Sequence, residues 1–297
     1  MEEIKIYDNI IFCNNWHHGD LHYSRELIKD IIKKIKSKNY ILAHNKKISK
    51  ESLKDIKDLE FIPFIPGIHI ESEIFKIEKN DLYINIWAGL TLQKSFEKYR
   101  TPNIPFYANL NNLYDIIKVL YKNLNIKVEE KNYYIPSINY QCIDEINLEK
   151  IKKLKSTKNI LFCNGNVWSG QSSNFNTNNL LSYLANKFKD YIFLCTDKSS
   201  PIDLDNILYT EDLLEIPGPD LIEISYISSF CDVLIGRGSG PYCFCITKEN
   251  IISKKFIGIG FKEPDISWCD INKFLFVNPE DLLLYIQIEN FIRRKNI

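Results

Sequence analysis

The chain has 297 residues, more than one typical domain, and 45% of them are hydrophobic and 26% charged, as in a globular protein. Its 38 basic and 38 acidic residues cancel, which argues against nucleic acid as a partner, because such binding depends on neutralising phosphate. No apolar run approaches the roughly 20 residues that a membrane helix needs. We therefore expect two globular domains in one chain.

The first residues are charged rather than apolar, so no secretory signal is expected. Three of the eight cysteines, Cys13, Cys163 and Cys195, lie inside apolar runs, where a free thiol behaves as a small hydrophobe. These features favour a protein of the reducing cytoplasm. The lysines between residues 33 and 38 are typical of a solvated helix face, and they leave open a peripheral contact with the inner face of a membrane.

In the first half, short apolar runs alternate with segments whose apolar residues recur every three or four positions. The runs are typical of buried parallel strands and the periodic segments of helices that cover them. A segment with Pro63, Pro66 and Gly67 is expected to be irregular or to form short strands. The predicted strands are 10–13, 40–43 and 82–87, and the predicted helices lie around 27–35 and 113–124.

The polar and charged segment 127–158 separates the two halves. We place the boundary at residue 145, with an N-terminal domain of 1–145 and a C-terminal domain of 146–297. After a helix near 148–154 the alternation restarts. The predicted strands are 159–163, 191–195, 233–235, 256–259 and 274–277, and the predicted helices are 180–188, 221–230, 241–247 and a last one from Pro279 onward.

This alternation predicts an α/β protein of two Rossmann-like, doubly wound domains that face each other across a cleft. The runs Ile11-Phe12-Cys13-Asn14 and Leu161-Phe162-Cys163-Asn164 support it, because each is an apolar strand that ends in Cys-Asn before a polar loop. The last helix is assigned to the C-terminal domain, with packing back on the N-terminal domain left open. Ligands of such sheets bind beyond the carboxyl ends of the strands.

The first candidate site is the polar loop after the first strand, residues 14–25, with three histidines and a tryptophan. Asp20 opens the following helix and could serve as a general base, or it could merely cap the helix. His18 and His22 are the titratable groups beside it. A histidine metal site is weakly supported, since no carboxylate or cysteine partner is evident, and we expect no metal.

The second candidate site is the glycine-rich turn after the apolar strand at 233–235. Gly238, Ser239 and Gly240 allow backbone N–H groups to approach an anion, and Arg237 could place a charge opposite phosphate. The turn has neither the Walker nor the dinucleotide-binding pattern. It predicts a diphosphate cradle, with a plain tight turn as the alternative.

The third candidate site combines the ends of two other predicted strands. Asn164, Gly165 and Asn166 begin a polar loop, and Thr196 and Asp197 end the next strand, so sugar or phosphate contacts compete with simple turn and capping roles.

A carboxylate stands in the helix before the glycine-rich strand. Glu223 could meet ribose hydroxyls, or it could occupy a solvated helix position.

Two segments resemble the heptosyltransferase-like GT-B glycosyltransferases of lipopolysaccharide and glycan assembly. Gly19-Asp20-Leu21-His22 resembles their Gly-Asp loop, and the helix, strand and Gly-x-Ser-Gly-Pro turn from Leu221 to Pro241 resembles their donor loop. The chain departs from that pattern with Trp16, His17 and His18 in the first loop, and with Tyr242 and Cys243 where a histidine would follow.

The resemblance implies a GT-B hexosyl- or heptosyltransferase that moves a sugar from a nucleotide-sugar to a glycan or lipid-linked acceptor. Asp20 would be the catalytic base, and the donor diphosphate would lie on 238–240. Transfer would be inverting and would need neither metal nor cofactor, because helix N-termini and Arg237 would stabilise the leaving diphosphate. Alternatives are a GT-B-shaped nucleotide-sugar epimerase or hydrolase and a non-catalytic nucleotide-sugar-binding subunit.

Overall fold

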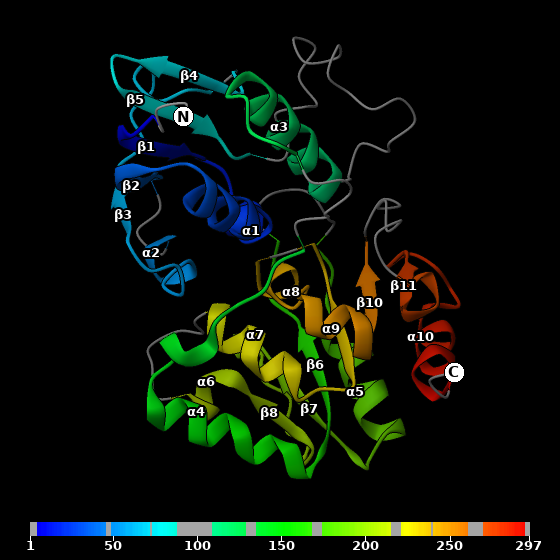
Figure 1. Ribbon diagram of the computed structural model, residues 1–297. Helices are drawn as coiled ribbons and strands as arrows, with labels where there is room; N and C mark the ends of the chain where they lie inside the picture. Colours follow the sequence, from blue (N-terminus) through cyan, green and yellow to red (C-terminus); the bar gives the residue numbers. More distant parts are fainter. Residues whose placement is uncertain are drawn as a thin grey trace. The chain divides into compact units, whose positions relative to one another are not determined.

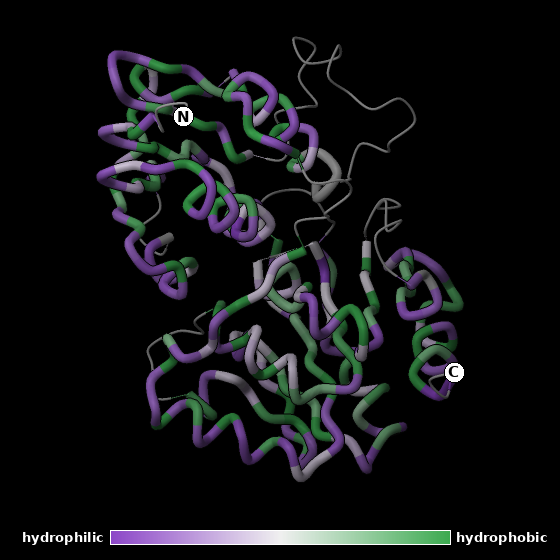
Figure 2. The backbone as a smooth tube through the Cα atoms, viewed as in Figure 1, coloured by the Kyte–Doolittle hydropathy of each residue, from purple (hydrophilic) through white to green (hydrophobic). Residues whose placement is uncertain are grey.

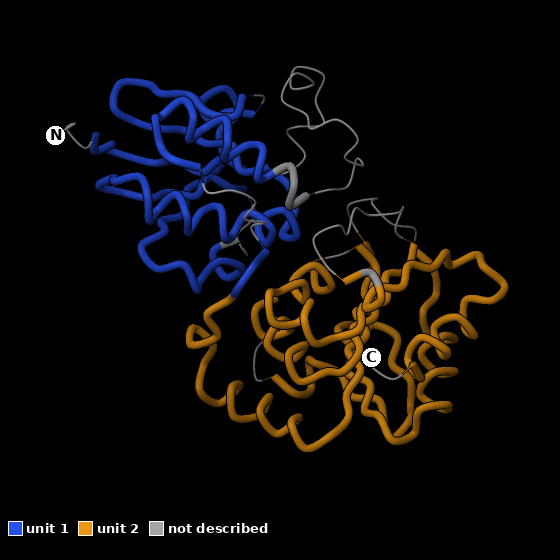
Figure 3. The backbone as a smooth tube through the Cα atoms, turned by 45° about the vertical axis from the view of Figure 1, so that its right-hand side comes forward, with its two compact units in different colours: residues 1–137 blue, residues 138–297 orange. Residues whose placement is uncertain are grey.

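A computed structural model describes residues 5–45, 49–71, 73–87, 109–128, 135–167, 174–214, 221–238, 240–260 and 270–294. The chain forms two compact units, residues 1–137 and 138–297 (Figures 1 and 3). Each unit is a sheet covered by helices and loops, as the alternating sequence pattern predicts.

Unit 1 contains a five-stranded sheet in the order β3-β2-β1-β5-β4. Strand β1 pairs in parallel with β2 and β5, β3 joins β2 in parallel, and β4 joins β5 antiparallel. In chain order the elements are β1 (Tyr7–Cys13), α1 (His18–Lys34), β2 (Ser37–Ala43), α2 (Ser49–Ser52), β3 (Leu59–Ile62), β4 (Phe75–Glu78), β5 (Asp81–Asn85) and α3 (Asn109–Asn123).

The core of unit 1 lies on both faces of β1. Alternate residues of a strand point to opposite faces, so Ile11 and Cys13 share one face, where they pack with Phe64 and Ile70 of the segment after β3. Helix α1 buries one apolar stripe and leaves a polar one outside, an alternation that Figure 2 shows along the helix. A hydrogen bond from the Tyr121 hydroxyl on α3 to the Asp30 carboxylate on α1 (2.8 Å) joins the two helices.

Unit 2 contains a six-stranded, wholly parallel sheet. Its order, β8-β7-β6-β9-β10-β11, reads 3-2-1-4-5-6 within the unit, which is the strand order of the Rossmann fold. The elements are η3 (Tyr140–Cys142), α4 (Glu145–Lys152), η4 (Lys153–Ser156), β6 (Lys158–Cys163), α5 (Asn178–Lys187), β7 (Tyr191–Cys195), β8 (Ile207–Tyr209), α6 (Thr210–Leu213), α7 (Leu221–Ser229), β9 (Val233–Gly236), α8 (Gly240–Phe244), α9 (Lys248–Ser253), β10 (Lys255–Ile259), η5 (Ile271–Lys273), β11 (Phe274–Val277) and α10 (Leu284–Arg293).

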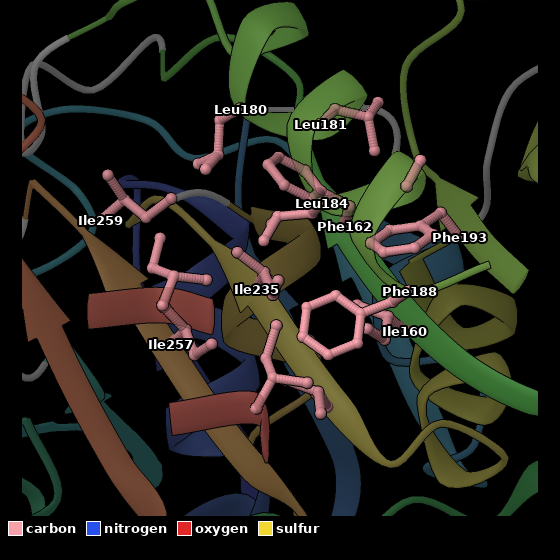
Figure 4. Close-up of a cluster of buried hydrophobic side chains, with 14 of the residues drawn as sticks. Ile160, Phe162, Leu180, Leu181, Leu184, Phe188, Phe193, Ile235, Ile257 and Ile259 are labelled. Carbon is pink, nitrogen blue, oxygen red and sulfur yellow. The ribbon is translucent and has the colours of Figure 1, made fainter. Parts of the chain in front are cut away.

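One hydrophobic cluster organises a face of this second sheet. Figure 4 shows side chains of α5 lying against the central strands, with Leu181 and Leu184 above Phe162 and Phe193. The same cluster includes Ile288 and Phe291 of α10. The buried face of the last helix therefore belongs to the core of unit 2.

The division between the units lies between Ser137 and Ile138, eight residues before the predicted boundary. The segment just after it packs on α7. The Tyr140 hydroxyl lies 3.0 Å from the Ser225 hydroxyl, and Ile143 is buried against Leu221 and Ile222. Residues 138–143, predicted from the sequence to belong to a polar linker, thus form part of the core of unit 2.

The structure differs from the predicted elements in several places, among them the antiparallel strand β4 and the short helices α2 and α6, which were not predicted. Strand β8 is three residues long and was not predicted, because so short a run carries little periodicity. The predicted helix 241–247 ends at Phe244 as α8, and a second short helix, α9, begins after Thr247, whose hydroxyl accepts the Asn250 N–H. The last helix begins at Leu284 rather than at Pro279, because the Asn278 and Asp281 side chains close turns before it.

Candidate functional site

The direction of winding reverses at one point in each sheet. The reversal lies between β1 and β5 in unit 1 and between β6 and β9 in unit 2. Open parallel sheets bind ligands beyond the carboxyl ends of the strands at such a point, because the connecting loops diverge there and leave a crevice. Residues that follow these four strands are therefore placed to meet ligands.

Asp20 closes the loop that leads from β1 into α1. The residue before the helix is His17, and its backbone N–H donates to the Asp20 carboxylate, with 3.3 Å between N and Oδ2. Asp20 is half-buried in the first helical turn, where the helix dipole favours a negative charge. The capping role considered from sequence is thus present, in the form of a capping box rather than an N-cap. The catalytic role of Asp20 stays a prediction beside it.

The two histidines beside Asp20 occupy different environments. His18 is half-buried, with Nδ1 3.2 Å from the Ser52 hydroxyl and its ring 6.2 Å from that of His44. His22 is fully buried on α1, with its ring 5.9 Å from that of Tyr23. The structure therefore leaves His18 partly accessible near Asp20 and gives His22 a packing position.

A buried ion pair anchors the middle of α1. Arg25 pairs with Asp55 and also donates to the Ser52 carbonyl, and both charged side chains are fully buried. Lys29 lies 3.5 Å from the other Asp55 oxygen. Charges are tolerated in the interior only when paired and hydrogen-bonded, so this contact fixes α1, and with it Asp20, against the segment 52–55.

Two asparagine–tryptophan pairs lie at the reversal point of unit 1. Asn14 follows β1, and its Oδ1 accepts the Trp16 backbone N–H at 3.0 Å. Asn85 ends β5, and its Oδ1 accepts the Trp87 N–H at 3.0 Å while its Nδ2 donates to the Glu71 carbonyl. Because β1 and β5 are neighbours, the two indoles meet and stack, with centroids 4.3 Å apart and planes 15° apart.

A cavity of about 380 Å³ lies beside this indole stack, within unit 1. Trp16 remains 46% exposed. Asn14 is only 2% exposed, and its Nδ2 has no hydrogen-bond partner among the described residues. The lining joins aromatic and aliphatic groups to three carboxamides and one carboxylate: Cys13, Asn14, Asn15, Trp16, Phe64, Pro66, Ile70, Glu71, Asn85 and Trp87.

Two titratable side chains at or near this cavity, Cys13 and His69, have pKa values shifted toward their neutral forms. Burial raises the pKa of the Cys13 thiol to about 12, so Cys13 is not a thiolate nucleophile at neutral pH. Burial, together with the charge of Lys76, lowers the pKa of His69. His69 Nδ1 accepts the Ile65 N–H at 2.7 Å, and this bond holds the turn that places Pro66 and Ile70 on the wall.

In unit 2, Asn164 joins the ends of β6 and β7. Its Nδ2 donates to the Asp197 carbonyl at 2.7 Å, and its Oδ1 accepts the Asp197 N–H at 2.9 Å. The Asp197 carboxylate accepts the Ser199 N–H. The turn chemistry considered from sequence is therefore present in both residues. Thr196 is buried, and its hydroxyl has no hydrogen-bond partner within the described part of the chain.

Arg237 bridges the two strands at the reversal point of unit 2. Its Nη2 donates to the carbonyls of Asn164 (2.7 Å) and Gly165 (2.6 Å), and its Nη1 donates to the Phe175 carbonyl (3.3 Å). The side chain is 1% exposed, burial lowers its pKa, and no described carboxylate forms an ion pair with it. Its Nε lacks a partner among the described residues. Arg237 thus positions the loop after β6, while direct contact with phosphate stays a prediction.

The last residue of β9, just before the glycine-rich turn, is closely packed against its neighbours. A Cβ on Gly236 would lie 2.6 Å from Tyr242 Cδ2 and 2.9 Å from Cys163 Cβ, so only glycine fits there. Gly238 is buried and Gly240 begins α8. Ser239 lies outside the described residues.

Two further predicted residues differ in accessibility. Asn166 is exposed, whereas Glu223 is fully buried on α7, so the solvated position considered for Glu223 is wrong. A buried carboxylate beside the glycine-rich strand remains compatible with a ligand or a structural role.

In the part of the chain that the structure describes, no group of three or more His, Cys, Asp or Glu side chains is arranged to hold a metal ion. Across the same residues, no helix is both long enough and apolar enough to cross a membrane.

The cavity of unit 1 was not predicted. The available signal was a repeated pattern, Asn-x-Trp, at 14–16 and at 85–87, each at the end of a strand. Pairing the two required knowledge that β1 and β5 are adjacent.

No protein-family model and no curated protein sequence matches the chain. Solved structures of similar fold do. The glycosyl transferase family 9 protein of Veillonella parvula is 11% identical, covers 99% of this chain and 92% of its own, and has a TM-score of 0.54. E. coli heptosyltransferase WaaC with ADP is 10% identical, with 96% of both chains covered and a TM-score of 0.56.

A third structure, from Listeria monocytogenes and described as a UDP-N-acetylglucosamine 2-epimerase, is 8% identical, covers 97% of this chain and 88% of its own, and has a TM-score of 0.50. These likenesses extend over nearly the whole chain and confirm the GT-B fold of two Rossmann-like domains. The resemblance to the heptosyltransferase-like enzymes is confirmed at the level of the fold.

Proposed function

We propose that the protein is a glycosyltransferase that moves a sugar from a nucleotide-sugar donor, held by unit 2, to a glycan or lipid-linked acceptor. The observation that carries the proposal is the position of Arg237 and Gly238 at the reversal point of a sheet in the 3-2-1-4-5-6 order. Proteins that share the fold over nearly the whole chain include a heptosyltransferase solved with ADP.

The donor site is assigned to the loops after β6 and β9. Gly238 lies two residues after the end of β9, where main-chain N–H groups can approach a diphosphate without a side chain between them. Arg237 binds the carbonyls of Asn164 and Gly165, and its guanidinium places a positive charge next to the loop after β6. Thr196 offers a hydroxyl without a described partner at the end of the adjacent strand.

The acceptor side is assigned to Asp20. Its carboxylate would take the proton of an acceptor hydroxyl as that oxygen attacks the anomeric carbon. The carbon–oxygen bond to the diphosphate breaks at the same time, and the nucleoside diphosphate leaves with the electron pair. Attack from the face opposite the leaving group inverts the anomeric centre. Positive charge and main-chain donors of unit 2 would stabilise the leaving diphosphate without a metal ion.

A thermal-shift screen against ADP, UDP, GDP and their sugars, with magnesium and with EDTA, tests the donor assignment. A nucleotide at about 100 times its dissociation constant should stabilise the fold by about 2.7 kcal/mol. A shift that persists in EDTA supports a metal-independent donor site. No shift with any nucleotide, or a shift only with magnesium, would contradict this part of the proposal.

Asp20→Asn tests the catalytic assignment. The amide can still accept the His17 N–H but cannot take a proton, so turnover should fall by about 10² to 10⁴-fold while nucleotide binding stays unchanged. Asp205→Asn is the matched control, because Asp205 is exposed in the loop before β8. Turnover is measured as transfer of labelled sugar to glycan and lipid extracts. Equal turnover in Asp20→Asn and wild type would remove Asp20 from the reaction.

A second candidate is a nucleotide-sugar epimerase or hydrolase, favoured by the likeness to the Listeria epimerase structure. It needs no acceptor. Incubation of the donor alone separates the two candidates, because an epimer or free sugar then appears at a rate that added glycan does not change.

A further inference from the structure

We propose that the cavity of unit 1 is a binding site for a neutral pyranose ring, stacked on Trp16 and hydrogen-bonded by the amides around it. That the bound sugar is part of the acceptor rests on the proposed function. The site itself rests on the geometry of unit 1 alone.

The location favours a ligand site. The cavity lies at the point where winding reverses between β1 and β5, which is where open parallel sheets bind ligands. Its volume of about 380 Å³ is at the lower end of the range for small-molecule pockets, about 300–1,000 Å³, which suits a small ligand rather than a long chain.

The two tryptophans of the site are held in place by hydrogen bonds and by stacking. Trp16 and Trp87 are each fixed by a hydrogen bond from their backbone N–H to an asparagine two residues earlier. Trp87 backs Trp16 at 4.3 Å, yet Trp16 keeps 46% of its surface exposed. A rigid, exposed indole face carries negative charge density, and the polarised C–H groups on one face of a pyranose are attracted to it.

The polar part of the site selects hydroxyl groups. Asn14 is 98% buried, and its Oδ1 is occupied by the Trp16 N–H, while its Nδ2 lacks a partner among the described residues. Asn15 and Glu71 are exposed on the lining, where they can donate to and accept from hydroxyls. An unsatisfied buried donor costs free energy, which a ligand oxygen at Nδ2 would recover.

The charge of the lining argues against a phosphate ligand. Glu71 is its one charged residue among those described, and neither lysine nor arginine lines it. The nearby Lys76 ammonium donates to the Ile68 carbonyl (3.0 Å) and lies 3.3 Å from Glu78. A nucleotide or lipid phosphate would meet the negative charge of Glu71 without a compensating cation in the lining.

Titration of the protein, without donor, against methyl glycosides of glucose, galactose, mannose and N-acetylglucosamine tests the site through tryptophan fluorescence. At least one glycoside should change the emission saturably. Trp16→Ala should weaken that binding at least 10-fold and Glu71→Gln several-fold. The control Ile68→Ala removes an exposed apolar side chain outside the lining and should bind as wild type.

Three results would overturn the site: no saturable change with any glycoside, equal affinity in Trp16→Ala, or tighter Trp16-dependent binding of adenosine, uridine or choline than of every glycoside.

The transfer assay separates this inference from the proposed function. Trp16-dependent sugar binding without transfer would refute the transferase and keep the site, whereas transfer with an unchanged acceptor KM in Trp16→Ala would keep the transferase and remove the acceptor role of the site.

Discussion

The reversal points of the two sheets both lie beside the first strand of their unit, but they differ in chemistry. In unit 1 the ends of β1 and β5 carry asparagines and tryptophans around a cavity without a lining cation. In unit 2 the ends of β6 and β9 carry a buried arginine and a glycine-rich turn. Topology places a candidate ligand site at each reversal point, and the residues after the strands set its chemistry, from which we propose a neutral hydroxylated ligand for unit 1 and an anionic one for unit 2.

Removal of the Arg237 side chain should have the largest effect on stability. Arg237→Met leaves the carbonyls of Asn164 and Gly165 without their donor. We therefore expect the free energy of unfolding of unit 2, measured by urea denaturation, to fall by about 2–3 kcal/mol. Arg293→Met is the control: its side chain is 53% exposed and its removal should cost about 0.5 kcal/mol or less. If Arg237→Met is as stable as wild type, the hydrogen bonds only offset the burial of the charge, and Arg237 would serve a ligand rather than the loop.

Close packing at the end of β9 is tested by a pair of glycines. Gly236→Ala forces Tyr242 or Cys163 to move and should destabilise by about 1–3 kcal/mol. Gly165→Ala is matched to it, because the nearest atom to its added Cβ is Asp197 Cβ at 3.6 Å, an ordinary contact, and the change should stay within about 0.5 kcal/mol. Thermal unfolding measures both. Equal losses of stability in Gly236→Ala and Gly165→Ala would show that the close contacts of Gly236 with Tyr242 and Cys163 do not require a glycine.

The corresponding change in unit 1 is Asn85→Ala. It removes the acceptor of the Trp87 N–H and the donor to the Glu71 carbonyl, so we expect a loss of about 1–2 kcal/mol and a shift in tryptophan emission as the indole stack loosens. Asn15→Ala, at an exposed position on the same lining, should leave stability unchanged. An unaltered emission spectrum in Asn85→Ala would mean that the stack does not depend on this asparagine.

The smallest effect is a dependence on pH. Because burial lowers the pKa of His69 in the folded protein, the unfolded chain binds the proton more readily. The contribution of the neutral His69 ring to the free energy of unfolding is fully present above the pKa of the unfolded chain, about 6.5, and decreases as the pH falls below that value. Urea midpoints at pH 7.5 and 5.5 should differ more in wild type than in His69→Gln. Identical differences would remove His69 from this response.

The strand and helix alternation was readable from sequence because buried parallel strands are continuous apolar runs, such as 10–13 and 159–163. Short elements such as β8 were not, because three residues carry no period. The predictions for Asp20 and for the glycine-rich turn at 238–240 rest on local residue types and stay predictions. The buried state of Glu223 and the carbonyl contacts of Arg237 depend on neighbours far along the chain, and local sequence does not specify them.

By itself, the sequence determined the elements and the polar loops that end them, since both follow from hydrophobic period and residue type over short distances. Only the tertiary structure decided which loops are neighbours. Strand β5 inserts beside β1, and that order brings Asn85 and Trp87 against Asn14 and Trp16, about seventy residues away. The cavity exists because backbone pairing joins distant strands, and no local pattern encodes that pairing.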